Sequence, residues 1–267
     1  MASEEDILLH YEDRYDEDAR LSKDGVGQLE LIRTQQILQR HLPAAPATVL
    51  DVGGGPGVYA YWLDGEGYEI ELIDIVPRHI RQATERGVRA RIGDARELPQ
   101  VDNSQDAVLL MGPLYHLQER DDRLTALAEA TRVARSGAPV FAAAISRYAP
   151  AIDGLDSGFF DNPEFASLLG PVTDTGRHHN PTDNPNYFTT SFFHLPEELE
   201  SEMLDTGLEN VEVLAVEGIG WVASDLDERM SRPHDRDGLL ELLESLETAP
   251  SILGASPHLL GVGWVAE

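Results

Sequence analysis

The sequence predicts an α/β fold with a parallel sheet that helices cover on both faces, and three observations support it. Short β-prone runs alternate with helical stretches between residues 48 and 145, which is typical of βαβ units. A glycine cluster follows the first of these runs, as expected where a strand turns into a helix. The chain has 267 residues, of which 42% are hydrophobic and 25% charged, so it can bury the core of one large globular domain.

Each element of this core follows from a local pattern. Strands are expected where β-prone residues run together, at residues 48–52, 68–75, 89–92, 106–111 and 140–145. Helices are expected where apolar residues recur at helical spacing, at residues 25–42, 58–63, 77–87 and 121–135. Pro77 suits the first turn of its helix, and Gly87 suits the position that ends it.

The alternation stops between residues 147 and 195, which are rich in Pro, Gly, Asp and Asn. A polar linker would lack aromatic residues, so we expect a folded insertion that lies over one edge of the sheet. Its phenylalanines are expected to wall a pocket rather than to pack a core of their own: Phe159, Phe160, Phe165, Phe188, Phe192 and Phe193. Beyond it we expect helices at 196–207 and 239–246, and strands at 211–216 and 258–265.

The charge of the chain is strongly unbalanced. Its 48 acidic and 20 basic residues give a formal net charge of -28, and Lys23 is the only lysine. Because so many like charges repel one another unless salt screens them, we expect a protein from a salt-loving organism. No basic patch marks a nucleic-acid surface, so we do not expect nucleic acid as a partner.

Composition also excludes several classes of protein. The chain has no cysteine, so disulfides, thiolate catalysis and Cys-ligated zinc are absent. No apolar stretch reaches the roughly 18 residues of a membrane helix, and the first ten residues are acidic where a signal peptide would be basic. We therefore expect a soluble, cytoplasmic protein without a membrane contact.

The glycine cluster lies where open α/β sheets bind ligands, between the first strand and the next helix. Asp51 precedes Gly53, Gly55 and Gly57. A loop without side chains lets the backbone approach a ligand, and the free amides at the helix start favour a carboxylate or a phosphate. A tight turn with no ligand is an equally common role for such a cluster on its own.

Two further acids follow the next two strands. Asp74 ends the second strand, where a carboxylate can accept both hydroxyls of a ribose. Asp94 and Ala95 close the third strand, where the carboxylate can accept from an adenine amino group and the neighbouring amide can donate to the ring. Either acid alone would be explained as a helix cap. Because all three features fall at the carboxyl ends of successive strands, together they predict a nucleoside site.

These residues resemble a known family. Residues 51–57, Asp74, residues 93–95 and residues 106–116 resemble the successive motifs of class I S-adenosylmethionine-dependent methyltransferases, over roughly residues 25–267. The likeness is strongest to the small-molecule, quinone-biosynthesis-like branch. It implies a Rossmann-like doubly wound sheet of seven strands with the last strand antiparallel.

The resemblance also implies which residues hold the cofactor, S-adenosylmethionine, and its product S-adenosylhomocysteine. The glycine loop would hold the methionine part, Asp74 with Ile75 the ribose, and Asp94 with Ala95 the adenine. Met111 and Gly112 would lie beside the sulfonium. N-terminal helices fold over the cofactor in this family, so Tyr15, Arg20 and Arg33 are expected contacts, with an arginine suited to the methionine carboxylate.

The expected organisation is a single methyltransferase domain over residues 1–267. Residues 1–24 are a polar lead-in within an N-terminal helical cap, residues 1–47. The cofactor-binding core is residues 48–146, the lid or substrate insertion is residues 147–195, and residues 196–267 complete the sheet.

The expected reaction is transfer of a methyl group to a small molecule by in-line displacement, in which alignment supplies most of the catalysis. Tyr115 and His116 follow the fourth strand and are candidate catalytic residues, with packing as the plainer role. His178 and His194 of the insertion are candidates for contact with the substrate, with a solvated loop as the plainer role. The spacing of the histidines fits no metal site, so no metal is expected.

Other readings of the sequence stay open. The family's signature for methylation of amines in bases appears here as residues 112–115, Gly-Pro-Leu-Tyr, which argues against that chemistry. One alternative is an RNA or protein methyltransferase with a helper subunit, and another is an inactive cofactor-binding scaffold. An NAD-dependent oxidoreductase is a third, but the dinucleotide motif fits only if it begins four residues after Asp51. The oligomeric state, monomer or homodimer, and the methylated atom are not predicted.

Overall fold

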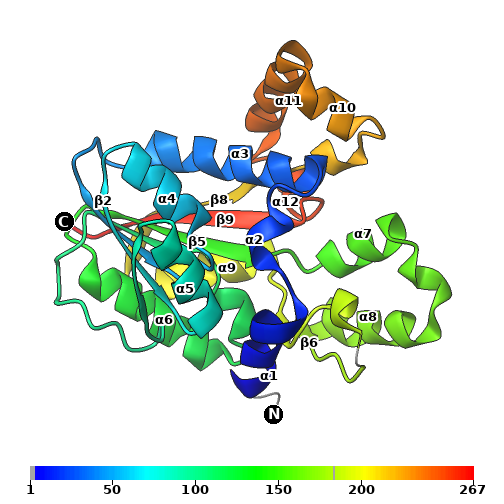
Figure 1. Cartoon of the computed structure of the whole chain (residues 1–267), viewed down its shortest axis with the longest axis horizontal. Helices are drawn as coiled ribbons and strands as arrows, with labels where there is room; N and C mark the ends of the chain where they lie inside the picture. Colours follow the sequence, from blue (N-terminus) through cyan, green and yellow to red (C-terminus); the bar gives the residue numbers. More distant parts are fainter. Residues whose placement is uncertain (1–3, 183) are drawn as a thin grey trace.

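A seven-stranded mixed sheet forms the centre of the molecule (Figure 1). The computed structural model describes residues 4–182 and 184–267. The strand order is β3-β2-β1-β4-β5-β9-β8, in which β9 runs antiparallel to both of its neighbours. The strands are β1 (Thr48–Val52), β2 (Glu69–Asp74), β3 (Arg89–Ile92), β4 (Ala107–Leu110), β5 (Pro139–Ile145), β8 (Leu208–Ala215) and β9 (His258–Val265). The predicted Rossmann-like fold with an antiparallel last strand is confirmed.

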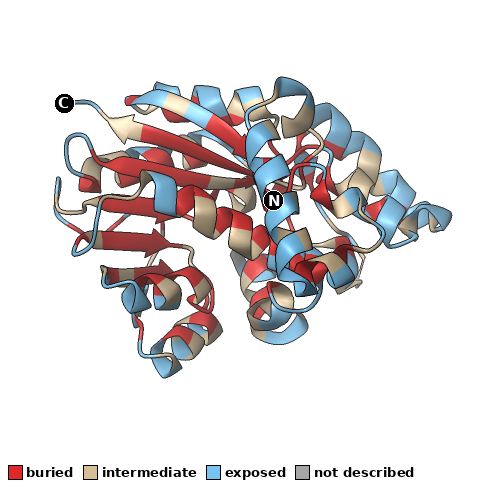
Figure 2. Ribbon diagram, turned by 90° about the horizontal axis from the view of Figure 1, so that it is seen from above, coloured by how far each residue is buried: buried red, intermediate tan, exposed pale blue. Residues whose placement is uncertain are grey.

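Helices cover both faces because successive side chains of each strand point to opposite sides. Val49, Leu109 and Phe141 pack on one face against α3 (Gly25–His41), α4 (Val58–Gly65) and α5 (Pro77–Glu85). Their chain neighbours Leu50, Val108 and Val140 pack on the other face against α6 (Arg120–Val133) and α9 (Pro196–Asp205). Figure 2 shows the central strands buried, and exposed residues on the edge strands and on the outer sides of the helices.

The N-terminal residues form a strap of short helices: α1 (Glu4–Leu9), a π-helical turn η1 (His10–Arg14) and α2 (Glu17–Arg20). The polar sequence gave little sign that this segment packs, yet Ile7 and Tyr11 are buried against Val76. The strap crosses the ends of the parallel strands (Figure 1). It therefore lies over the edge where the expected ligand site is found.

The insertion is folded, as expected, but its aromatic residues behave differently from the prediction. It contains α7 (Ala149–Asp156), η3 (Phe159–Asp161), α8 (Pro163–Thr175), η4 (Pro185–Tyr187) and a small hairpin of β6 (Arg177–His178) and β7 (Ser191–Phe192). Phe159, Phe160 and Phe165 pack with one another, and Tyr187 joins them. Phe165 and Tyr187 are buried and form a small core of the insertion, whereas Phe160 lies at its edge and is exposed. Of the insertion's phenylalanines, only Phe188 lines either of the two cavities described below.

The C-terminal part contains η5 (Gly220–Val222), α10 (Leu226–Ser231), α11 (Pro233–Leu246) and α12 (Pro250–Leu253). Of these, α10 and α11 project from the body of the molecule (Figure 1). The side chains of Leu226, Met230 and Leu243 are buried in one cluster with Leu29 of α3. Among the described residues, no helix combines the length and the apolar character needed to cross a bilayer.

Candidate functional site

A cavity of about 380 Å³ lies at the carboxyl ends of the first four strands. Each strand is followed by a short segment that lines it, namely residues 53–56 after β1, 74–76 after β2, 93–96 after β3 and 111–113 after β4. The strap lines the opposite side with Ile7, Tyr11, Glu17, Arg20 and Leu21. The structure thus brings the sequence-predicted glycine loop, Asp74, Ile75, Asp94, Ala95, Met111 and Gly112 together in one place.

The glycine loop needs glycine for steric reasons at two positions. Gly53 has φ of 68°, and a Cβ there would lie 2.5 Å from Cδ of Pro113. A Cβ on Gly54 would lie 2.2 Å from Oδ2 of Asp51. Because both the conformation and the space exclude a side chain, the bare backbone of the loop faces the cavity.

Asp74 holds the edge of the cavity together. Its carboxylate accepts from the backbone N–H of Gly55 at 2.9 Å and from that of Val76 at 2.8 Å. Nδ1 of His79 lies 3.3 Å from the same carboxylate. Asp74 therefore ties the glycine loop to the end of β2 at the position where the sequence predicts a ribose.

Asp94 lies across the cavity and is half-buried. Its carboxylate accepts from the backbone N–H of Arg96 at 2.8 Å and from the guanidinium of the same residue at 2.6 Å. Burial alone would raise the pKa of Asp94, but the hydrogen bonds from Arg96 lower it below its usual range. Asp94 is thus held as an anion beside the buried Ala95.

Asp51 lies directly under the loop and does not line the cavity. Its side chain is fully buried, and neither carboxylate oxygen has a hydrogen-bond partner among the described residues. Burial, and next to it the charge of Asp74, raises the pKa of Asp51 to about 7. An acid left unpaired at this depth fits a site that receives the positive amino group of a ligand above the loop.

The segment after β4 carries the candidate catalytic pair. The hydroxyl of Tyr115 donates to the carbonyl of Met111 at 3.2 Å, and His116 Nε2 lies 3.0 Å from the Tyr11 hydroxyl. Burial lowers the pKa of His116 to about 4, so the ring is neutral at pH 7. Both residues line the cavity, and a neutral imidazole in contact with a phenol can exchange a proton there.

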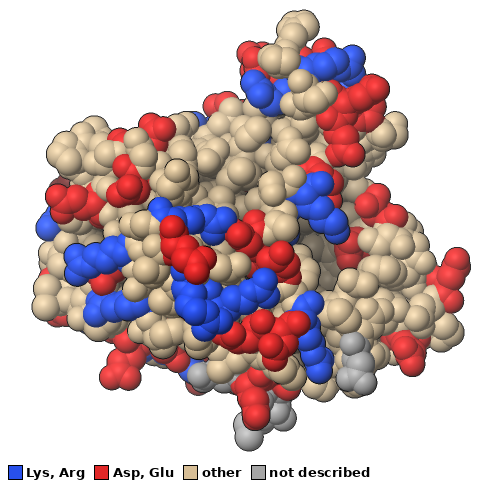
Figure 3. All heavy atoms as spheres, viewed as in Figure 1, with Lys and Arg blue, Asp and Glu red and all other residues tan. Residues whose placement is uncertain are grey.

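Ion pairs fix the strap to α5 and the adjoining loop. Arg78 Nη2 pairs with Asp16 at 3.1 Å, Arg81 pairs with Glu12 at 3.1 Å, and Arg86 pairs with Asp18. Figure 3 shows blue and red side chains interleaved over this face of the molecule. The arginines are neutralised by acids of the same chain, so this face offers no continuous basic surface.

The three cofactor contacts expected from the N-terminal part have different positions. Arg20 lines the large cavity, but its guanidinium is held by Glu17 at 2.7 Å and by Glu30 at 3.0 Å. Tyr15 lines a smaller neighbouring cavity instead. Arg33 lies at neither, and this expectation is corrected: its side chain is fully buried, pairs with Glu247 and donates to the carbonyl of Val216 at 3.3 Å.

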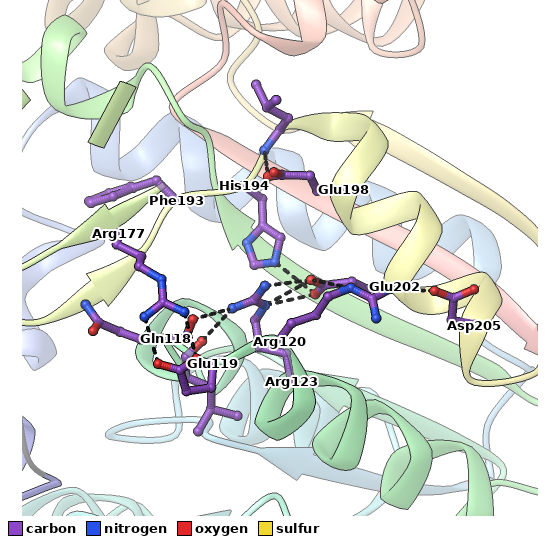
Figure 4. Close-up of polar contacts among 12 residues, drawn as sticks. Gln118, Glu119, Arg120, Arg123, Arg177, Phe193, His194, Glu198, Glu202 and Asp205 are labelled. Atoms are coloured by element: carbon purple, nitrogen blue, oxygen red, sulfur yellow. Dashed lines mark hydrogen bonds and ion pairs between the residues drawn. The ribbon is translucent and has the colours of Figure 1, made fainter. Parts of the chain in front are cut away.

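The two insertion histidines also lie away from both cavities, so their expected contact with the substrate is corrected. His178 is buried, and its Nε2 donates to the carbonyl of Tyr187 at 2.8 Å. His194 is fully buried and points to Glu202 at 3.3 Å, beside Arg123 (Figure 4). Arg123 Nη2 in turn contacts Glu202 at 2.6 Å. His194 thus joins the insertion to α9 of the core, and His178 links two segments within the insertion.

Sequence reasoning missed several residues that line the two cavities: Tyr11, Glu17, Glu30, Tyr59, His79, Thr190 and His258. For Glu30 a signal was present. It falls three residues after Gly27 and seven before Ile37 on the buried side of α3, where a charged residue is out of place unless it is paired. The others depend on contacts between distant segments, which no local pattern reveals.

The chain is similar to methyltransferases in sequence and in fold. Residues 49–137 match the family model described as a methyltransferase domain. An uncharacterized methyltransferase of Mycobacterium tuberculosis (strain ATCC 25618 / H37Rv) is 36% identical over 99 residues, which is 36% of this chain and 39% of that protein. The chain thus spans about two fifths of the length of the curated relatives it matches.

Two solved structures share the fold at low sequence identity. Phosphoethanolamine N-methyltransferase 2 of Haemonchus contortus, in complex with S-adenosyl-L-methionine, has a TM-score of 0.60 at 14% identity and covers 100% of this chain and 61% of that one. A putative methyltransferase in complex with the Haloferax volcanii Trm112 methyltransferase activator has a TM-score of 0.56 at 19% identity. The match covers 94% of this chain and 96% of that one. The fold predicted from the sequence is that of S-adenosylmethionine-dependent methyltransferases.

Proposed function

We propose that this chain, whose residues 49–137 match a methyltransferase domain, transfers a methyl group from S-adenosylmethionine to a small-molecule acceptor. One observation carries the proposal. A side-chain-free loop, a ribose-type carboxylate and an adenine-type carboxylate follow three successive parallel strands and meet at one cavity of about 380 Å³.

Each part of the cavity has a role in this proposal. The loop of residues 53–57 and the unpaired acid below it, Asp51, suit the amino acid part of the cofactor. Asp74 suits the ribose and Asp94 the adenine amino group, because an ionised carboxylate only accepts hydrogen bonds. The cofactor supplies an electrophilic methyl group on a sulfonium.

The residues of the chain then act mainly by alignment. A displacement at carbon gains about 7 to 11 kcal/mol from the correct placement of its partners, so no nucleophilic side chain is required. Tyr115 and His116 lie beside Met111 at the end of β4, where they can orient the acceptor and take a proton from it. A proton acceptor of this kind contributes roughly 10²- to 10⁴-fold to a rate.

A small acceptor is favoured over a macromolecule by what surrounds the cavity. The strap lies over the strand ends, and its ion pairs with α5 and the adjoining loop hold it there. The quinone-biosynthesis-like branch that the sequence resembles is one candidate within this class. The activity, the acceptor, any partner and a cytoplasmic location of the whole protein are proposals. A salt-rich environment is a further proposal, and the net charge of -28 supports it.

A second candidate is a methyltransferase for RNA or protein that works with a helper subunit. The fold neighbour from a complex with an activator supports keeping it, since a partner would supply the basic surface that this chain lacks. It predicts salt-dependent binding of tRNA or ribosomal RNA once the partner is present.

The experiment is calorimetry of the purified protein with S-adenosylmethionine and S-adenosylhomocysteine in molar KCl. We expect binding of both, and Asp74→Ala should abolish it, while Asp64→Ala on the exposed side of α4 should not. Incubation with labelled cofactor and a metabolite extract should then add fourteen daltons to one small compound. No heat with either ligand would contradict the proposal.

A further inference from the structure

A second, smaller cavity adjoins the first. Its volume is about 90 Å³, and six residues line both cavities: Tyr11, Glu17, Arg20, Tyr59, Met111 and Tyr115. Since water occupies about 30 Å³ in the liquid, the smaller cavity holds only a few heavy atoms. It opens beside Met111, where the methyl group is expected to lie, so it suits the reacting end of an acceptor.

Aromatic rings form the walls of the smaller cavity. Tyr15 and Phe188 complete the ring of tyrosines shared with the larger cavity. Phe188 has φ of 64° and ψ of 177°, a conformation that costs a side-chain-bearing residue free energy and that is found mainly at ligand sites. Aromatic faces attract cations, so such walls favour an ammonium group over a carboxylate.

The charged groups of the smaller cavity leave an excess of negative charge. Arg20 is occupied by Glu17 and Glu30, and Nδ1 of His258 contacts Glu217, which lies behind it, and lies 3.7 Å from Glu30. These carboxylates raise the pKa of His258 to about 9 in spite of its burial, so the imidazole is charged at pH 7. Among the residues that line the cavity, Arg20 and His258 balance Glu17 and Glu30, and the excess negative charge comes from Glu217, which is buried behind His258.

The same contacts argue against a metal ion in this cluster. Glu30, Glu217 and His258 each offer a ligand atom within 4.8 Å of the others. However, the guanidinium of Arg20 already grips both oxygens of Glu30, and Ser256 and the backbone N–H of His258 hold Glu217. A metal would have to displace these donors to collect enough ligand atoms, whereas an ammonium group needs only a remaining lone pair on a carboxylate.

We propose that the smaller cavity binds the amino group of a small amine, which is the methyl acceptor. This inference rests on the proposed function and names its substrate class. The acidic side of the cavity would face the nitrogen, and the apolar side, formed by Ala143, Ile145 and Leu260, would face its carbon chain.

The chemistry explains why acids would surround the acceptor. The amine first loses its extra proton to water. The lone pair of the neutral nitrogen then forms a bond to the methyl carbon as the carbon–sulfur bond breaks, and the pair from that bond stays on the sulfur. Positive charge thereby moves from sulfur to nitrogen, where nearby carboxylates stabilise it in the transition state. An anionic acceptor would gain nothing from these carboxylates.

The test is calorimetry on protein saturated with S-adenosylhomocysteine, with butylamine, butanol, butyrate and catechol as probes. We expect butylamine to bind at least tenfold more tightly than the other three. Glu30→Gln should weaken butylamine at least tenfold and, because it releases Arg20, improve butyrate. Tyr15→Leu should weaken butylamine and leave butanol unchanged, which separates the aromatic contribution from misfolding. Glu241→Gln, on the exposed face of α11, is the matched control.

The outcomes separate this inference from the proposed function. If S-adenosylhomocysteine itself does not bind, the proposed function fails and the inference with it. If it binds but butanol, butyrate or catechol binds as well as butylamine, the amine proposal is wrong and the methyltransferase proposal survives. The same conclusion follows if none of the four probes binds. Labelled methyl transfer to butylamine, compared with butanol, gives a second readout.

Discussion

Asp51 shows how a single residue can be costly to the fold and useful to the site. A buried carboxylate without a hydrogen-bond partner is destabilising, and neither oxygen of Asp51 has a partner among the described residues. Gly54, which leaves room for the carboxylate, belongs to the same local motif. In the proposed function this cost is offset when the positive amino group of the cofactor lies above the loop.

Asp51→Asn should stabilise the ligand-free protein at pH 8. The folded state holds the Asp51 proton more tightly than the unfolded chain does, because the pKa is about 7 rather than 3.8. The contribution of this group is therefore most favourable below pH 3.8 and is lost as the pH rises to 7, by at most about 4 kcal/mol. Denaturant melts at pH 5 and pH 8 measure it, and we expect the gain to be larger at pH 8. A loss of stability at pH 8 would show that the carboxylate is paired.

His116→Ala should slow methyl transfer and spare cofactor binding. The imidazole lines the cavity and contacts Tyr11 rather than Asp74 or Asp94, and loss of a proton acceptor should reduce the rate about 10²- to 10⁴-fold. Tyr11→Phe removes only the hydroxyl that contacts His116 and should give part of the same loss. Single-turnover rates, compared with calorimetry for S-adenosylhomocysteine, separate the two steps. An equal loss of binding would make His116 a structural residue.

At the scale of the elements, strands were predicted better than contacts between elements. The bounds of β3 and β9 agree with those expected from the sequence, because apolar runs and glycine turns mark them locally. The strap and the insertion were not predicted in detail, since α1, α2 and α7 are too short to show a helical pattern and the strap is stabilised by packing against Val76, far away in the sequence.

The residues of the candidate site were likewise predicted where a local motif marks them, and not where contacts between distant segments decide their position. The glycine loop, Asp74 and Asp94, which the sequence predicts as ligand contacts, line one cavity, because each belongs to a motif next to a strand end. Arg33, His178 and His194 were misassigned because nothing in their neighbourhood in the sequence shows that Glu247, Tyr187 and Glu202 would occupy them. Residue type alone suggested ligand contacts, whereas tertiary packing uses these side chains as internal links.

Glu202→Gln should destabilise the protein by about 3 kcal/mol. Glu202 of α9 joins Arg123 of α6 to His194, which follows β7, and all three side chains are buried. Removing the carboxylate leaves a buried guanidinium without its counter-charge, and such losses cost about 3–5 kcal/mol. Chemical denaturation measures the change, with Glu200→Gln, exposed on the same helix, as the control. A difference between the two variants below about 1 kcal/mol would show that this link contributes little.

At the scale of the whole molecule, acidic residues outnumber arginines and lysines by 48 to 20, so the basic residues cannot neutralise all of the acids. Many arginines form ion pairs with acids of the same chain, as Arg78, Arg81 and Arg86 do with acids of the strap. The remaining carboxylates repel one another across the surface, and this repulsion favours expanded states of the chain. Its strength depends on the solution rather than on any single residue.

The melting temperature should therefore rise by several degrees between 0.1 M and 2 M KCl. The Debye length falls from about 10 Å at 0.1 M to about 3 Å at 1 M, so salt removes most of the repulsion between exposed carboxylates. A variant in which five exposed, unbridged acids become glutamine should melt higher at low salt and respond less to KCl: Glu69, Glu85, Glu200, Glu209 and Glu241. Calorimetric scans of both proteins in a KCl series test this. A wild-type melting temperature that falls as KCl rises would show that screening of attractive ion pairs outweighs the relief of repulsion, and the salt-adapted interpretation of the charge would then be wrong.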